Sequence, residues 1–111
     1  MSLSTHVLDT AAGRPAEGVE VACSRREGDA WVLLAERRTD GDGRIPDLLP
    51  AGDLRAGEHR LTFATGSWAA ARGVECFWPQ IDITFTVTAP EEHHHVPVLL
   101  SPYGYTTYRG S

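Results

Sequence analysis

The chain has 111 residues, a formal net charge of −5, and ten basic residues that are all arginine. A mildly acidic chain without a basic stripe does not fit nucleic acid binding, and this length predicts one domain over residues 1–111. No apolar run approaches the roughly 20 residues that cross a bilayer, and the first residues lack the layout of a signal peptide. A cytoplasmic protein without a membrane partner is therefore expected.

Alternation of apolar and polar residues predicts a series of short strands, most clearly over residues 81–88. In the first strand, one face should carry Leu3, Thr5 and Val7 and the other should carry Ser4, His6 and Leu8. In chain order, the predicted strands cover residues 3–8, 19–23, 31–38, 59–65, 81–88, 93–100 and 103–108.

Segments rich in Gly, Pro and charged residues separate these strands. One short helix is predicted over residues 66–73, with Ser67 as its N-cap and Gly73 as its stop. Seven to eight short strands with one brief helix predict an all-β fold, an antiparallel β-sandwich. The predicted turns and loops cover residues 9–18, 25–29, 39–44, 47–56 and 89–92.

Two cysteines, Cys23 and Cys76, occur without any CxxC motif. In a reducing compartment both are expected to be small reduced core residues. A disulfide between them would require an oxidising compartment and a separation that the sequence does not give.

Three consecutive histidines, His93, His94 and His95, precede an apolar run. In a strand, His93 and His95 share one face, so at most two of the three could reach one metal ion, with Glu91 and Glu92 nearby. Catalytic zinc normally has three well-placed protein ligands, so no metal site is predicted. A solvated histidine at a strand end is the common case, and a histidine that carries out acid–base chemistry is the rarer one.

The segment 40–43 reads Asp-Gly-Asp-Gly and invites comparison with a calcium loop. With Asp40 as loop position 1, Ile45 stands where an EF-hand requires Gly and Ala51 where it requires Glu, so a simple turn is predicted. Arg44 follows this turn, and its planar charged fork suits an anionic or carbonyl-rich ligand. No GxSxG or phosphate-binding glycine loop is present, so any hydrolysis would use activated water.

Four motifs in order make the chain resemble the transthyretin-like family of 5-hydroxyisourate hydrolases over essentially its whole length. The last of them, Tyr-Arg-Gly-Ser at residues 108–111, separates these enzymes from transthyretin itself. The other matched segments are residues 3–16, 38–45 together with 61–66, and 95–105. Departures lie at His94, where the family usually has an aromatic residue, and at residues 68–71 and 76–79.

The resemblance implies a two-sheet sandwich that assembles as a homotetramer, a dimer of dimers, with sites in the channel between dimers. It implies hydrolysis of the N1–C6 amide of 5-hydroxyisourate, giving 2-oxo-4-hydroxy-4-carboxy-5-ureidoimidazoline, without a cofactor. His6 and His95 would activate water, Arg44 would stabilise charge, and Ser111, by its hydroxyl or terminal carboxylate, would close the site. Tyr108, Arg109 and Gly110 would complete the substrate-binding set, which also includes His6 and Arg44.

The rival function is a small-ligand carrier that uses the same channel without catalysis. A carrier channel should be lined by apolar and small side chains, whereas the matched positions carry His6, Arg44 and His95, which are costly to bury unpaired. A plain structural sandwich would show no urate-linked activity, and a histidine-based metal binder would in addition retain zinc after purification. The enzyme is therefore the predicted function.

Overall fold

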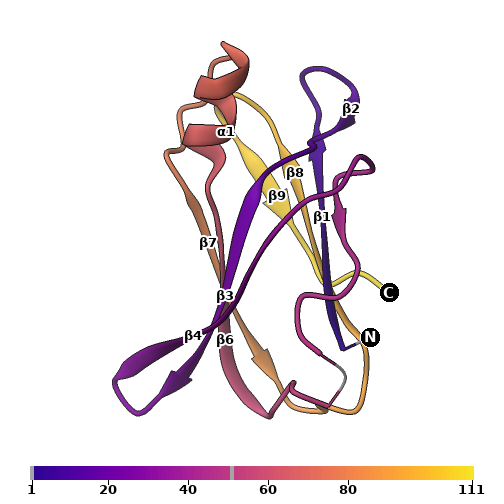
Figure 1. The fold of residues 1–111 in the computed structure, drawn as a ribbon, viewed down its shortest axis with the longest axis vertical. Helices are drawn as coiled ribbons and strands as arrows, with labels where there is room; N and C mark the ends of the chain where they lie inside the picture. The colour runs from indigo at the N-terminus through magenta and orange to yellow at the C-terminus, as the bar shows by residue number, and fades with distance from the viewer. Residues whose placement is uncertain (1, 51) are drawn as a thin grey trace.

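A computed structural model describes residues 2–50 and 52–111 as two β-sheets packed face to face, with one helix at one end (Figure 1). Met1, and Ala51 within the loop predicted over 47–56, lie outside the described residues. The first sheet contains, in order, β2 (Arg14–Pro15), β1 (Leu3–Asp9), β8 (His94–Leu100) and β9 (Tyr105–Thr107), with β5 (Arg44–Ile45) also paired to β1. The second contains β4 (Ala30–Arg38), β3 (Glu20–Glu27), β6 (Gly57–Phe63) and β7 (Ile81–Val87).

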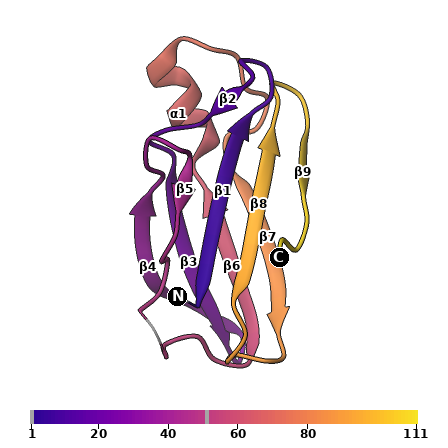
Figure 2. The same cartoon turned by 90° about the vertical axis from the view of Figure 1, so that its right-hand side faces the viewer.

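The predicted sandwich is confirmed, but one strand pair departs from the antiparallel expectation. β1 and β8 pair in parallel, whereas the other pairs within the described residues are antiparallel. Figure 2 faces this sheet and shows β5, β1, β8 and β9 side by side. The parallel pair places a strand from the start of the chain beside one from near its end. A period-two pattern predicts which face of a strand is buried, but it does not predict whether two paired strands run parallel or antiparallel.

The core lies between the two sheets. Val7 and Val98 from the first sheet and Leu61 and Phe63 from the second are fully buried. The predicted facing of the first strand is confirmed, because Leu3, Thr5 and Val7 are fully buried. The loop predicted over 47–56 also contributes to the core, through Leu48, Leu49 and Leu54.

The turn predicted over residues 25–29 is present but shorter than predicted. Strand β3 continues to Glu27, with Arg25 opposite Val32 and Arg26 opposite Trp31, and the chain reverses at Gly28 and Asp29. This hairpin end projects beyond the rest of the sandwich (Figure 1), so its side chains do not need the half-buried alternation that marks a strand in the sequence.

The helix α1 (Thr65–Arg72) begins one residue earlier than predicted, and Ser67 is not its N-cap. Ala64 occupies that position without a side-chain bond, while the Ser67 hydroxyl donates to the Ala64 carbonyl at 3.2 Å. Gly73 ends the helix as predicted, with a left-handed φ of 66°. Among the described residues, no helix is long and apolar enough to cross a membrane.

Candidate active site

Strand register places four polar side chains together on the outer face of the first sheet. On β1, Ser4 lies opposite His95 of β8, and His6 lies opposite Arg44 of β5. Ser4 and His6 are two residues apart, so they share the face that points away from the core. Pairing of β1 with both β5 and β8 therefore brings together residues that are up to 91 positions apart in the chain.

The Ser4 hydroxyl lies between two imidazole rings. Its oxygen is 2.7 Å from His95 Nδ1 and 2.9 Å from His93 Nε2. Ser4 is buried, His95 is half-buried and His93 is exposed. These contacts confirm that His93 and His95 share a face, and they fix the plane of the His95 ring.

His6 is held by the turn that precedes Arg44. Its Nε2 lies 2.9 Å from the Asp42 carbonyl oxygen, which only accepts hydrogen bonds, so Nε2 carries a proton. A neutral His6 therefore keeps its lone pair on Nδ1. His6 is half-buried at this position.

Asp40 organises the turn between β4 and β5. Its carboxylate accepts from the backbone N–H groups of Asp42 and Arg44, both at 2.9 Å. Gly43 has a φ of +73°, and a Cβ there would lie 2.4 Å from the Val7 carbonyl oxygen, so only glycine fits. The predicted turn is present, and its conformation sets the direction of the chain where β5 begins at Arg44.

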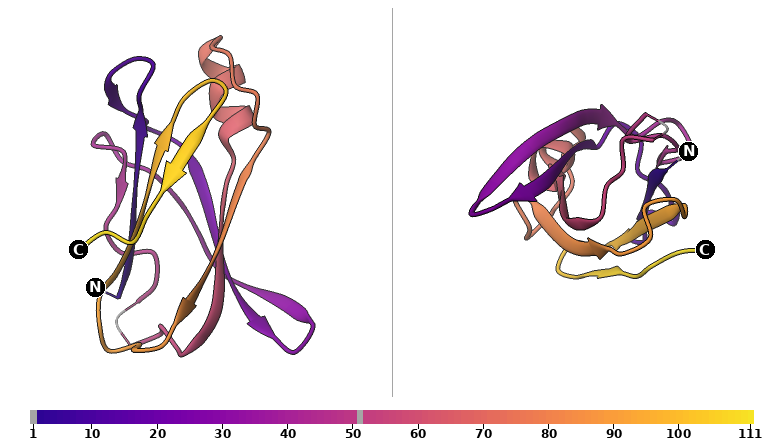
Figure 3. Two further views of the ribbon diagram at one scale, coloured as in Figure 1. Left: turned by 180° about the vertical axis from the view of Figure 1, so that it is seen from behind. Right: turned by 90° about the horizontal axis from the view of Figure 1, so that it is seen from below.

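The C-terminal segment returns across β8 after β9, as Figure 3 shows from behind. The Gly110 N–H donates to the His95 carbonyl at 2.8 Å, forming an isolated antiparallel bridge. A Cβ at Gly110 would lie 2.4 Å from His95 Cδ2, so the chain passes directly against the imidazole. Gly110 therefore limits the positions that the His95 ring can adopt, and Ser111 follows it.

A polar cavity of about 200 Å³ opens at this place. Arg44, His95 and Ser111, all predicted from the sequence as site residues, line it together. His6 is not among its lining residues but acts electrostatically on His95. The lining also includes four residues not predicted as site residues: Ser4, Thr5, Pro46 and His93.

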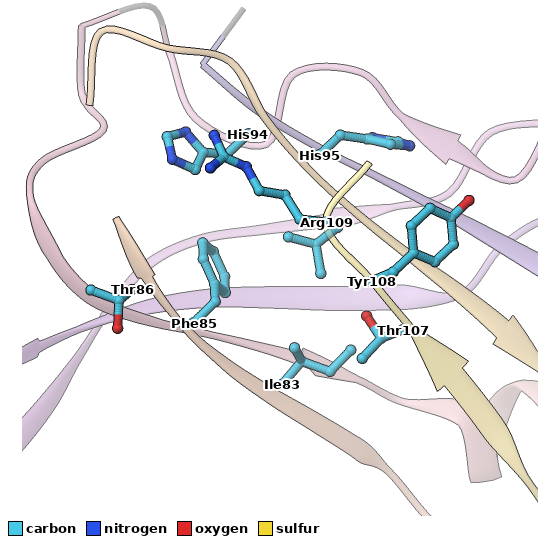
Figure 4. Close-up of a pocket in the computed structure, with 9 residues that line it drawn as sticks. Ile83, Phe85, Thr86, His94, His95, Thr107, Tyr108 and Arg109 are labelled. Carbon is cyan, nitrogen blue, oxygen red and sulfur yellow. The ribbon is translucent and has the colours of Figure 1, made fainter. Parts of the chain in front are cut away.

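Tyr108 and Arg109 lie elsewhere, on a neighbouring apolar cavity of about 210 Å³. Figure 4 shows them with Ile83 and Phe85, which come from β7. Arg109 donates to the Glu92 carboxylate at 3.3 Å, an exposed ion pair that contributes little stability. His95 lines both cavities, so Tyr108 and Arg109 lie in a cavity next to the one that holds Arg44.

The environment of His95 lowers its pKa below the ordinary value of 6.5. Partial burial is the largest cause, followed by the positive charge of His6, His93 and Arg44, while a hydrogen bond with the Ser4 backbone acts in the opposite direction. His95 is consequently neutral at pH 7 and has a lone pair available to accept a proton.

Ser4 is a site residue that the sequence pattern alone does not single out. It stands two positions before His6 on the same face of a predicted strand, which is the signal that could have found it. His94 is buried, its Nδ1 lies 2.9 Å from the Glu92 carbonyl oxygen, and it lines only the apolar cavity. In the part of the chain that the structure describes, no three His, Cys, Asp or Glu side chains are grouped to hold a metal ion.

Comparison with known proteins adds an independent finding. The model of the HIUase/Transthyretin family matches residues 3–110. A 5-hydroxyisourate hydrolase of Caulobacter vibrioides is 49% identical, over 98% of this chain and 97% of its own.

Two solved structures have the same fold. The 5-hydroxyisourate hydrolase of Klebsiella pneumoniae superposes with a TM-score of 0.86 at 43% identity and covers 100% of both chains. Sea bream transthyretin in complex with thyroxine superposes with a TM-score of 0.92 at 30% identity, covering 99% of this chain and 95% of the other.

Proposed function

This chain belongs to the HIUase/transthyretin family, and we propose that it hydrolyses 5-hydroxyisourate in urate breakdown. Two relatives with this activity in their names match it nearly end to end, at 49% and 43% identity. The observation that carries the proposal is the polar cavity in which a neutral His95 and the cationic Arg44 meet. Amide hydrolysis needs both a proton acceptor and a positive group.

The reaction proposed is hydrolysis of the N1–C6 amide of the six-membered ring. The oxygen of water bonds to C6, the C6–N1 bond breaks, and N1 gains a proton. The carboxyl group formed then ionises and releases a proton at neutral pH. Water is the co-reactant, so the proposal includes no cofactor.

The assigned roles follow from position and charge. His95 Nε2 accepts a proton from the attacking water, and His6 assists in moving protons across the site. Arg44 stabilises the negative charge that develops on the carbonyl oxygen at C6. Ser111, which lines the cavity, closes the site by its hydroxyl or its terminal carboxylate.

The tail residues next to the cavity receive different roles. Gly110 positions His95, because its backbone packs on the imidazole. Tyr108 and Arg109 are exposed at the neighbouring cavity and bind the polar edges of the ring after their side chains turn toward it. Among the residues that the structure describes, the ion pair lost in this movement is the exposed Arg109–Glu92 pair, which contributes little stability.

Assembly as a homotetramer, a dimer of dimers, is part of the proposal. Strand β9 lies at one edge of the first sheet and β7 at one edge of the second, and an open edge is a template for association. A molar mass of four chains by light scattering is the expected result, and a monomer would contradict it. We also place the enzyme in the cytoplasm, where the free thiols of Cys23 and Cys76 would be stable.

A carrier is the second candidate, favoured by the close superposition with a transthyretin that binds thyroxine. One assay separates the two. Urate oxidase generates 5-hydroxyisourate in place, and the decay of its ultraviolet band is timed with and without the protein. Fast decay that is lost in His6→Ala and Arg44→Ala supports the enzyme. Decay at the spontaneous rate with folded protein favours the carrier.

A further inference from the structure

The Ser4 hydroxyl has one hydrogen but two imidazole neighbours, at 2.7 Å for His95 Nδ1 and 2.9 Å for His93 Nε2. A hydroxyl that contacts two ring nitrogens can donate to one of them and must accept from the other. The three groups therefore form a directed chain, in which one imidazole donates to Ser4 and Ser4 donates to the other.

Charge selects the direction of this chain. His95 Nδ1 is engaged by Ser4, so Nε2 is the ring nitrogen left for the cavity that the cationic Arg44 also lines, and a cation favours a lone pair over an N–H on it. His95 then carries its proton on Nδ1 and donates it to Ser4, which donates to His93 Nε2. This order leaves His95 Nε2 bare and able to accept a proton.

Once His95 accepts a proton, its charge is poorly tolerated. The ring is partly desolvated, and the permanently charged Arg44 on β5 lines the same cavity, with the rings of His6 on β1 and of His93, just before β8, also close to it. His93 is exposed to water, which stabilises a cation far better than the cavity does. Movement of the charge outward, to a ring in contact with water, therefore takes it away from the cavity that Arg44 lines.

We propose that Ser4 and His93 form a proton relay that takes the positive charge from His95 while the tetrahedral intermediate exists. This inference rests on the proposed hydrolysis. As water bonds to C6, His95 Nε2 takes its proton, Nδ1 passes a proton to Ser4 Oγ, and Ser4 passes its own to His93 Nε2. When the C6–N1 bond breaks, His95 Nε2 protonates N1 and the two other protons return, which restores the starting state.

In this account Ser4 and His93 are positioning and relay residues rather than catalytic ones. Loss of the relay slows kcat while KM is retained, because neither side chain is needed to bind the ring. His93→Gln and Ser4→Ala should each lower kcat by about 10- to 100-fold, less than loss of the base itself. Ser4→Thr keeps the hydroxyl and should restore most of kcat. Glu91→Gln, an exposed neighbour, is the matched control.

The deciding measurement is a proton inventory, the dependence of kcat on the deuterium fraction of the solvent. If several protons move in the rate-limiting step, the plot of kcat against deuterium fraction is curved, and we expect this for the wild type and for Glu91→Gln. If only one proton moves, the plot is straight, and we expect this for His93→Gln and Ser4→Ala. Curved plots and unchanged kcat in both relay variants would overturn the proposal. Wild-type protein that does not exceed spontaneous decay would instead overturn the hydrolysis itself.

A second readout does not depend on turnover. Nitrogen-15 NMR of the histidine side chains reports which nitrogen of His95 carries the proton. We expect the proton on Nδ1 in the wild type and a mixture of tautomers in Ser4→Ala. A wild-type His95 with its proton on Nε2 would overturn the proposed direction and with it the relay.

Discussion

Gly110 lies against the imidazole of His95 so closely that a Cβ on it would be 2.4 Å from His95 Cδ2. The same glycine donates its N–H to the His95 carbonyl at 2.8 Å. The tail thus holds both the backbone and the ring of the central site residue. This contact gives a physical reason for a glycine at this place in the tail, independent of any contact with substrate.

Gly110→Ala should lower activity while leaving the fold intact. The added methyl group must displace the His95 ring, and a small misplacement of a proton acceptor lowers the rate by about 10- to 100-fold. Gly104→Ala is the matched control, since its Cβ would meet only the Ser101 hydroxyl at 3.4 Å. Steady-state rates and melting temperatures of both variants provide the measurement. Equal activity of the two variants would contradict the positioning role.

Gly43→Ala should destabilise the protein, by about 2 kcal/mol or more. The residue has a φ of +73°, and the new Cβ would meet the Val7 carbonyl oxygen at 2.4 Å, a backbone atom that cannot move aside cheaply. Gly41→Ala, whose Cβ would have only the Glu17 carboxylate at 3.9 Å, should change stability far less. Urea denaturation measures both free energies of unfolding. Similar values would show that the turn does not need its second glycine.

The pH dependence of kcat/KM should reveal the lowered pKa of His95. Burial and the positive neighbours keep the ring neutral, so activity should fall only when the pH drops through a value below 6.5. Arg44→Gln removes one positive neighbour and should move this acidic limb to higher pH, whatever its effect on the maximal rate. An NMR titration of His95 in both proteins checks the assignment. A limb that stays in place or moves to lower pH would contradict the electrostatic argument.

Stability should fall on mild acidification because of His59. This ring is fully buried against Phe85 with no partner for Nε2 among the described residues, and burial, followed by the charges of Arg25 and His94, lowers its pKa below 6.5. Below pH 6.5 the unfolded chain binds a proton that the folded chain resists, so stability declines until the folded pKa is reached. His59→Phe should flatten this decline. If the unfolding free energy of His59→Phe declines between pH 7.5 and 5 as steeply as that of the wild type, groups other than His59 cause the decline.

Much of the fold could be predicted from local patterns. Strand β7 (Ile81–Val87) alternates cleanly, and the helix stop at Gly73 is confirmed. The hairpin end at Arg25 and Arg26 escapes prediction because neither residue is apolar, although Arg25 is half-buried, so no alternation of apolar and polar residues marks the strand there. The N-cap prediction for Ser67 is wrong because a serine near a helix start can equally bond back to a carbonyl, here that of Ala64.

The site required information that a linear pattern does not contain. Residue chemistry singled out Arg44 and the histidine run that contains His95, and only the resemblance grouped them with His6. Strand pairing shows why they lie close together: β1 lies between β5 and β8. The role of Ser4 depends on the register that puts it opposite His95, which no single strand encodes. The placement of Tyr108 and Arg109 depends on how the tail crosses β8, so it too could not be predicted from the sequence.

The most direct test of the central claim is the turnover of His95→Asn on 5-hydroxyisourate generated in place by urate oxidase. Asparagine can still donate an amide hydrogen to Ser4, so the local hydrogen bond is kept while the lone pair of Nε2 is lost. With folding verified by circular dichroism, the rate should fall by about 10²- to 10⁴-fold, toward the spontaneous decay. A folded His95→Asn protein with wild-type turnover would contradict the assignment of His95 as the proton acceptor.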